Sequence, residues 1–98
     1  MESYKLTKAA DLDFETIFEY GIENYGLGKA TVYQKQLISR FIELVKQPLF
    51  YPSVDYIRQG YRRSVCGINS IYYRIEKNEI LIVRILGKQD PHAELNQS

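Results

Sequence analysis

The chain has 98 residues, which suffices for a single domain (1–98) with a modest core. Its 45% hydrophobic and 26% charged residues exclude a disordered chain, and a net charge of +1 excludes binding to nucleic acid through bulk charge alone. Cys66 is the only cysteine, so no intrachain disulfide can form, which suits a reducing compartment. With no signal peptide and no apolar run near the roughly 20 residues that span a bilayer, we expect a soluble, cytoplasmic protein.

The first half of the chain predicts a strand followed by two helices. Residues 4–6 alternate between apolar and polar, as in a short strand, and Thr7 is suited to cap the helix that follows. Apolar residues then recur at helical spacing over 14–25, and the segment 24–28 predicts a stop and a five-residue connection. A second apolar stripe covers 30–45 and ends at a Gln-Pro pair, so the two helices should form a hairpin.

The second half predicts a loop followed by three strands. Residues 48–60 contain two prolines and a glycine, which favours a loop. Segments 61–66, 68–75 and 80–86 are rich in β-branched and aromatic residues, and 80–86 is apolar on both faces except at one arginine, which places it centrally. Residues 87–98 are polar and predict a partly mobile tail. The predicted fold is α+β, with the order β-α-α-β-β-β and an antiparallel sheet covered by the N-terminal helix hairpin.

Four segments carry a resemblance to a known family. Residues 6–12 read Leu-Thr-Lys-Ala-Ala-Asp-Leu, and residues 57–63 read Ile-Arg-Gln-Gly-Tyr-Arg-Arg. Residues 71–74 read Ile-Tyr-Tyr-Arg after Gly67, and residues 82–86 read Ile-Val-Arg-Ile-Leu shortly before an Asp-Pro pair. In this order, and over nearly the whole chain, the segments resemble ParE-type toxins of the RelE/ParE toxin–antitoxin superfamily.

The resemblance implies the toxin component of a type II toxin–antitoxin system, a class linked to bacterial stress response and plasmid maintenance. Its expected partner is a cognate ParD-like antitoxin, which forms a hetero-oligomer with the toxin and wraps along the helix hairpin and the sheet. Its expected target is DNA gyrase, through the A-type gyrase polypeptide, which such toxins inhibit without catalysis. The resemblance implies no cofactor, no membrane association and no direct sequence-specific contact with nucleic acid.

Basic residues gather in and beside the three predicted strands, together with aromatic residues of the loop. Arginine and tyrosine are enriched in protein interfaces, whereas the plainer interpretation is solvated strand charges and local ion pairs. The residues expected to bind antitoxin or target are Arg58, Tyr61, Arg62, Arg63, Arg74, Arg84 and Lys88. Arg84 interrupts an apolar strand, so its guanidinium needs a partner, for which Asp90 and Glu76 are candidates.

The aromatic loop residues Phe50, Tyr51, Tyr56 and Tyr61 allow two interpretations. They either cover the core or form part of a binding groove. Their residue types suit both a protein interface and the stacking of nucleic-acid bases, so composition does not choose between them.

An enzymatic alternative is a RelE-like, ribosome-dependent mRNA endoribonuclease. Asp90, Pro91 and Leu95 stand where that class carries basic and tyrosine side chains, and His92, the only histidine, lies in the polar tail. We therefore expect no catalytic residue, and a single Cys and a single His are too few for a zinc site. A third interpretation is an inactivated toxin that only binds its antitoxin, because this sequence departs from the family pattern at Asn69 and at the glycine that follows 82–86.

Overall fold

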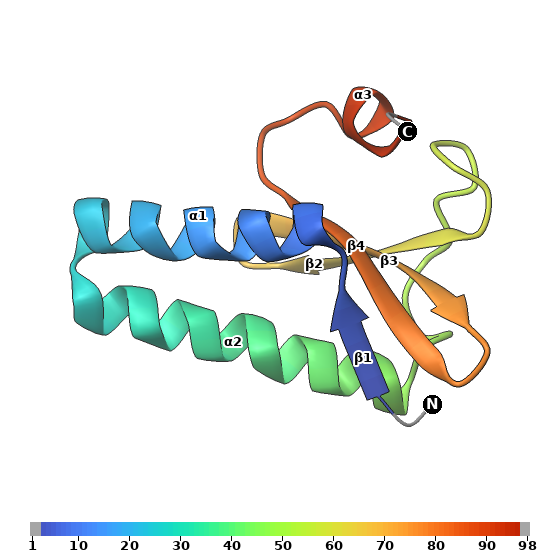
Figure 1. The fold of residues 1–98 in the computed structure, drawn as a ribbon, viewed down its shortest axis with the longest axis horizontal. Coiled ribbons are helices and arrows are strands. Elements are labelled where there is room, and N and C mark those ends of the chain that lie inside the picture. Colours follow the sequence, from blue (N-terminus) through green and yellow to red (C-terminus); the bar gives the residue numbers. More distant parts are fainter. Residues whose placement is uncertain (1–2, 97–98) are drawn as a thin grey trace.

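The computed structural model describes residues 3–96, and it confirms the predicted α+β class and the order of the first six elements (Figure 1). A short helix follows the last strand. The elements are β1 (Ser3–Leu6), α1 (Lys8–Tyr25), α2 (Leu27–Lys46), β2 (Tyr61–Cys66), β3 (Asn69–Glu76), β4 (Glu79–Leu86) and α3 (Pro91–Leu95).

The four strands form one mixed sheet in the order β1-β4-β3-β2. β4 lies between two neighbours, as its apolar faces predicted. β2, β3 and β4 are antiparallel, but β1 runs parallel to β4, in register from Ser3 opposite Glu79 to Leu6 opposite Ile82. The expectation of a purely antiparallel sheet is therefore corrected at β1. No turn joins β1 to its partner, so the local sequence, which sets orientation in hairpins, carried no signal here.

Thr7 fixes the start of α1 against the sheet. Its side-chain oxygen accepts a hydrogen bond from the Ala10 N–H at 3.1 Å, and its hydroxyl donates to the Val83 carbonyl of β4 at 2.8 Å. The two helices are then joined by Gly26 alone, whose φ of 91° reverses the chain direction. The predicted connection over 24–28 is thus too long, because the helices continue up to this glycine on both sides.

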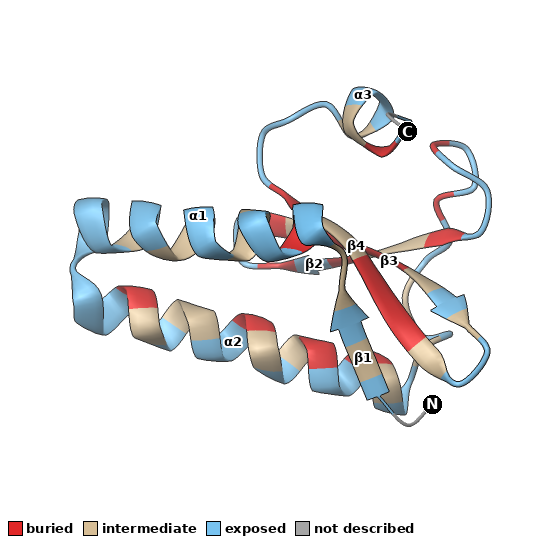
Figure 2. Ribbon diagram, viewed as in Figure 1, coloured by how far each residue is buried: buried red, intermediate tan, exposed pale blue. Residues whose placement is uncertain are grey.

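Two apolar clusters lie on opposite faces of the sheet, as the alternation of side chains along the strands requires. Figure 2 shows buried residues along β4 and along one side of α2, whereas α1 is mostly exposed or half-buried. The cluster beneath the helices contains Ala10, Leu37, Phe41, Leu44, Cys66, Ile71, Tyr73, Ile80, Ile82 and Ile85. The cluster on the other face contains Val54, Ile57, Tyr61, Tyr72, Leu86 and Leu95.

The C-terminal segment is more ordered in structure than the predicted polar tail over 87–98. The Asp90 side chain accepts a hydrogen bond from the His92 N–H at 3.0 Å and so caps α3. Leu95 is only 3% exposed and belongs to the second apolar cluster. A five-residue helix has little stability of its own, so this tertiary contact decides its formation. Residues 97–98 of the predicted tail lie outside the described residues.

Candidate functional site

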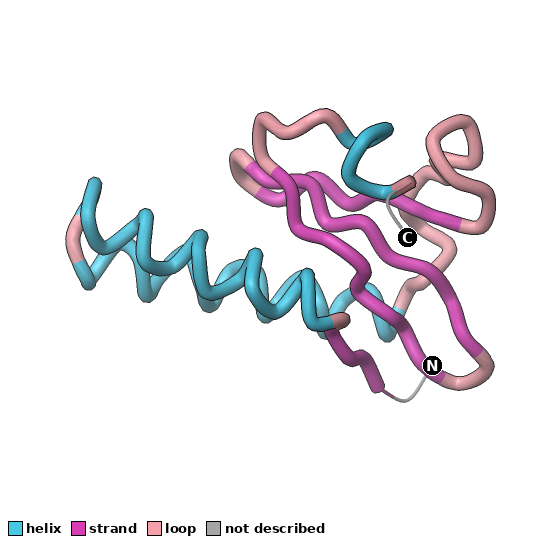
Figure 3. The backbone as a smooth tube through the Cα atoms, turned by 45° about the horizontal axis from the view of Figure 1, so that its top comes forward, coloured by secondary structure: helices cyan, strands magenta, loops and turns pink. Residues whose placement is uncertain are grey.

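The helix hairpin extends beyond the sheet, and the connection between α1 and α2 lies farthest from it (Figure 3). Between the extended part and the β2–β3 turn lies an apolar groove of about 430 Å³. Its lining includes Ile17, Phe18, Tyr20, Tyr33, Gly67 and Ile68. We refer to this feature as the hairpin groove.

Tyr33 shapes the hairpin groove from α2. Its hydroxyl lies 2.8 Å from the Cys66 carbonyl oxygen and 2.7 Å from Asn69 Oδ1, so it ties the helix to both sides of the β2–β3 turn. Burial is the main reason why the pKa of Tyr33 is raised. Gly67 has a φ of 58°, and a Cβ atom there would stand 2.6 Å from Tyr33 Cε1. The turn therefore approaches the tyrosine ring as closely as only glycine allows.

Large apolar side chains surround the hairpin groove without being covered. Tyr25 is 60% exposed, Leu27 62% and Ile68 76%. A contiguous apolar surface of this kind marks a docking site more often than a free surface.

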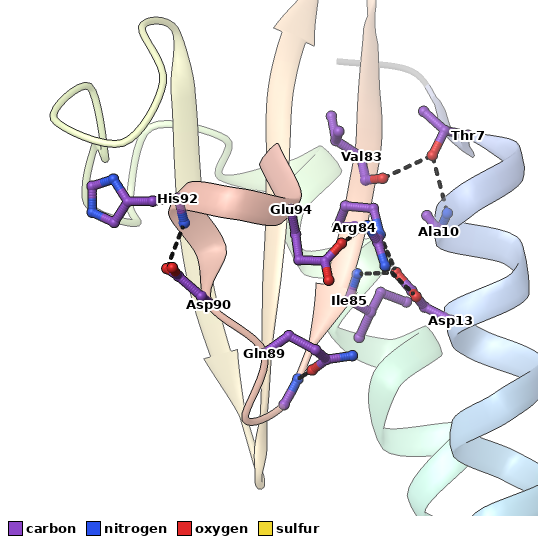
Figure 4. A network of polar contacts seen from close by, with 11 residues as sticks. Thr7, Ala10, Asp13, Val83, Arg84, Ile85, Gln89, Asp90, His92 and Glu94 are labelled. Atoms are coloured by element: carbon purple, nitrogen blue, oxygen red, sulfur yellow. Dashed lines mark hydrogen bonds and ion pairs between the residues drawn. The ribbon is translucent and has the colours of Figure 1, made fainter. Parts of the chain in front are cut away.

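Arg84 lies at the centre of a polar network between α1, β4 and α3 (Figure 4). Its Nε and Nη2 donate to Asp13 Oδ2 and Oδ1 at 2.7 and 2.9 Å, and its Nη1 donates to Glu94 Oε2 at 2.9 Å. Asp13 Oδ2 also accepts a hydrogen bond from the Ile85 N–H at 2.9 Å. The hydrogen bonds to Asp13 are the main cause of a raised Arg84 pKa, so the guanidinium stays charged and engaged.

The partners expected for Arg84 were wrong. Glu76 lies at the far end of β3 and pairs with Arg74, with Nη2 and Oε2 2.7 Å apart. Asp90 instead caps α3 through the His92 N–H. The two carboxylates that hold Arg84 come from a distant helix and from the segment that was expected to be a mobile tail.

Arg58, Tyr61 and Arg62 lie together around the loop before β2. The Arg58 guanidinium carbon is 5.7 Å from the centroid of the Tyr61 ring, and Arg58 Nη1 donates to the Leu95 carbonyl at 3.1 Å. Arg62 Nη1 donates to the Tyr51 carbonyl at 2.8 Å. Both arginines thus bond to backbone carbonyls, while the Tyr61 ring is buried.

The remaining candidates have different surroundings. Arg63 contacts the hydroxyls of Tyr72 and Tyr56, and the contact with Tyr72 is the main cause of its raised pKa. Arg74 Nε is buried and has no hydrogen-bond partner within residues 3–96. Lys88 is exposed beyond the end of β4. The structure therefore gathers Arg58, Tyr61, Arg62 and Arg63 near one loop but leaves Arg84 and Lys88 elsewhere.

The aromatic loop divides between the two functions considered for it. Tyr61 is 6% exposed and belongs to the second apolar cluster, so it covers core. Phe50 and Tyr56 are 71% and 68% exposed, so they are available for contact with a partner. Tyr51 is half-buried, and its ring lies 5.6 Å from the Arg40 guanidinium carbon.

Sequence reasoning missed several residues that the structure brings to these surfaces. Asp13 and Glu94 are separated from Arg84 by 71 and 10 residues, so no local pattern connects them. Tyr33 was identified as part of an apolar helix stripe, but not as the residue that holds the β2–β3 turn. For Ile68 a signal existed, because an isoleucine directly after a turn glycine is poorly placed to be buried.

The residues considered for catalysis are far from forming a reactive cluster. The His92 side chain is exposed in α3, whereas Cys66 is buried beneath the helices, where burial raises the pKa of its thiol. Within residues 3–96, no three or more His, Cys, Asp or Glu side chains are arranged to hold a metal ion. In the same part of the chain, no helix is long and apolar enough to cross a membrane.

Comparisons with known proteins agree with one another. A family model described as the ParE toxin of type II toxin–antitoxin system, parDE, matches residues 4–91. The chain is 27% identical over 86 residues to Toxin ParE1 of Caulobacter vibrioides, covering 88% of each chain. It is 29% identical over 84 residues to Toxin ParE1 of Mycobacterium tuberculosis, covering 85% of this chain and 86% of the relative. A solved structure described as the chromosomal ParDE TA system from P. aeruginosa shares the fold, with a TM-score of 0.73, 23% identity and coverage of 91% and 98% of the two chains.

Proposed function

This chain belongs to the ParE toxin family of type II toxin–antitoxin systems, and on that premise we propose that it inhibits DNA gyrase by binding and is neutralised by a ParD-like antitoxin. The antitoxin occupies the hairpin groove. The target is bound by the basic surface formed by Arg58, Tyr61, Arg62, Arg63 and Arg74, together with Lys88 beyond β4.

The observation that carries the antitoxin proposal is the uncovered apolar lining of the hairpin groove. An amphipathic helix presents apolar side chains at intervals of three and four residues, and such a row fits an elongated apolar groove. Ile17 and Phe18 on α1 and Tyr33 on α2 offer the complementary wall. A neighbouring toxin structure is described as a ParDE system, which supports a ParD-like occupant.

The engagement of Arg84 supports a target that is bound and not cut. A ribonuclease of this fold needs free cationic groups around the scissile phosphate and an acid or base within reach. Arg84 already contacts the two carboxylates of Asp13 and Glu94. Asp90 adds a further negative charge in the segment after β4, which would repel a phosphate there.

The test of the target uses the purified chain in two assays. With DNA gyrase and relaxed plasmid, we expect loss of supercoiling and accumulation of cleaved DNA. In a translation extract, we expect intact mRNA. Ribosome-dependent mRNA cuts with unchanged supercoiling would replace this proposal by the endoribonuclease alternative, and inactivity in both assays would favour a chain that only binds its antitoxin.

The hairpin groove is tested by a charge placed on its rim. Ile68→Glu removes an exposed apolar contact, so we expect antitoxin affinity to fall at least about tenfold, the usual effect of losing an interface anchor. Leu49→Glu is the matched control, because Leu49 is 68% exposed and lies beyond the other end of α2. Equal affinities of the two variants for the antitoxin would place its binding site elsewhere.

A further inference from the structure

Arg63 is held by two phenol groups in place of a carboxylate. Its Nη1 lies 3.5 Å from the Tyr72 hydroxyl and its Nη2 lies 3.4 Å from the Tyr56 hydroxyl. These contacts are near the outer limit of hydrogen bonding, whereas Arg84 binds Asp13 at 2.7 and 2.9 Å. Within residues 3–96, Arg63 forms no ion pair.

The two phenols add donors to the same place. Each hydroxyl oxygen accepts from the guanidinium, so its own hydrogen is directed elsewhere, and no acceptor for either hydrogen is found within the described part of the chain. Tyr72 is 2% exposed, so its hydroxyl is not simply solvated as a surface group. A guanidinium and two phenols thus converge as donors with no acceptor, and the complementary group is an oxyanion.

The surrounding charge favours a polyanion over a single carboxylate. Residues 53–63 contain three arginines and one acid, Asp55, whose carboxylate already accepts from the Gly60 N–H at 2.8 Å. Arg58 and Arg62 bond only to backbone carbonyls among the described residues. Helix α1, by contrast, carries five acids and one lysine. The net charge of +1 therefore conceals a cationic face opposed to an acidic helix.

We propose that Arg63, Tyr56 and Tyr72 bind a phosphodiester oxygen of the DNA backbone. The proposal rests on the proposed function, which brings the chain next to DNA held by gyrase. A repeating backbone places further phosphates within reach of Arg58 and Arg62, which one carboxylate of a protein partner would leave unused. Contacts to phosphate carry no sequence information, so the binding is not sequence-specific.

The test measures the binding of a short fluorescent DNA duplex of mixed sequence by anisotropy at several salt concentrations. For Arg63→Gln we expect affinity to fall about tenfold, as for one charged hydrogen-bonding group, and the salt dependence to decrease by about one counterion. Tyr56→Phe should weaken binding less and leave the salt dependence unchanged, because no charge is lost. Tyr56 is 68% exposed, so this second variant keeps the fold.

Lys35→Gln is the matched control, because Lys35 is an exposed cation on α2 that lies away from the arginine loop. Equal losses in Arg63→Gln and Lys35→Gln would show bulk attraction only and would overturn the site. Absence of wild-type binding at low salt, or displacement of DNA by a glutamate-rich peptide that binds more tightly through Arg63, would also overturn it. The supercoiling assay is separate: normal gyrase inhibition by Arg63→Gln with lost DNA binding rejects the phosphate site alone, whereas inactive wild type with Arg63-dependent DNA binding rejects the gyrase target alone.

Discussion

Arg84 of β4 and Asp13 of α1 face each other in a two-point contact, with both carboxylate oxygens accepting from the guanidinium at 2.7 and 2.9 Å. The side chains are 18% and 11% exposed, so the pair is largely removed from water. Asp13 also accepts from the Ile85 N–H. One carboxylate therefore satisfies a strand amide and a buried cation together, and it joins the first helix to the last strand.

We predict that Asp13→Asn lowers the free energy of unfolding by about 3 kcal/mol, because it leaves a partly buried cation with one carboxylate only. Chemical denaturation monitored by circular dichroism measures the change. Asp11→Asn, an exposed position of the same helix, is the control and should cost less than about 1 kcal/mol, the size of a helix-dipole contribution. Similar losses in the two variants would mean that the pair contributes only surface electrostatics.

Gly67 permits the second prediction. Gly67→Ala should destabilise the fold by about 2 kcal/mol, because alanine is strained at a φ of 58° and its Cβ would meet the Tyr33 ring. Gly28→Ala is the matched control, since nothing lies within 4 Å of a Cβ atom at that helical position, and it should be neutral or slightly stabilising. Thermal unfolding decides the matter, and a wild-type melting temperature for Gly67→Ala would contradict the close approach.

Alkaline pH should weaken the fold through Tyr73. Burial raises its pKa to about 12, from 10.0, and its hydroxyl donates to the Pro48 carbonyl at 2.7 Å. Because the folded state holds the proton more tightly, the contribution to stability is complete below pH 10 and is lost as pH rises through 12. Denaturation at a series of pH values measures this loss. Tyr73→Phe should be less stable at neutral pH by about 1 kcal/mol and should show a shallower loss across that window. An unchanged slope would show that other groups titrate there.

Periodicity predicted most of the secondary structure because helices and strands bury their apolar faces at fixed intervals. The stripe over 30–45 became α2, and the apolar segment 80–86 became the central part of β4. What periodicity lacks is any signal for orientation or distance. The parallel pairing of β1 depends on contacts with residues more than 70 positions away, and no turn links the two strands.

The candidate surfaces were only partly predictable for the same reason. Composition pointed to the arginines and tyrosines of the loop and β2, and the structure places several of them together. It did not reveal that Arg84 is occupied by Asp13 and Glu94. Nor did it reveal the hairpin groove, whose shape depends on how far the helices extend beyond the sheet. Leu95 was assigned to a polar tail because a single leucine among polar residues has no periodicity.

The last prediction separates binding from chemistry at the C-terminal segment. His92 has an exposed side chain, and its backbone N–H alone bonds to Asp90. His92→Ala should therefore arrest growth as the wild type does when expressed without antitoxin. A general acid or base would behave differently, because its removal usually costs about 100- to 10,000-fold in rate.

Leu95→Ala provides the contrast, since it empties a buried site of the second apolar cluster and should lower the free energy of unfolding by about 2–5 kcal/mol. We expect its toxicity to fall together with its melting temperature, because α3 would no longer be held against the loop that carries Arg58. Growth arrest, the DNA-damage response and mRNA integrity are measured in the same cells. Site-specific mRNA cuts that vanish in His92→Ala, while Leu95→Ala still cuts in proportion to its folded fraction and no DNA damage is induced, would establish histidine chemistry and replace gyrase binding as the basis of toxicity.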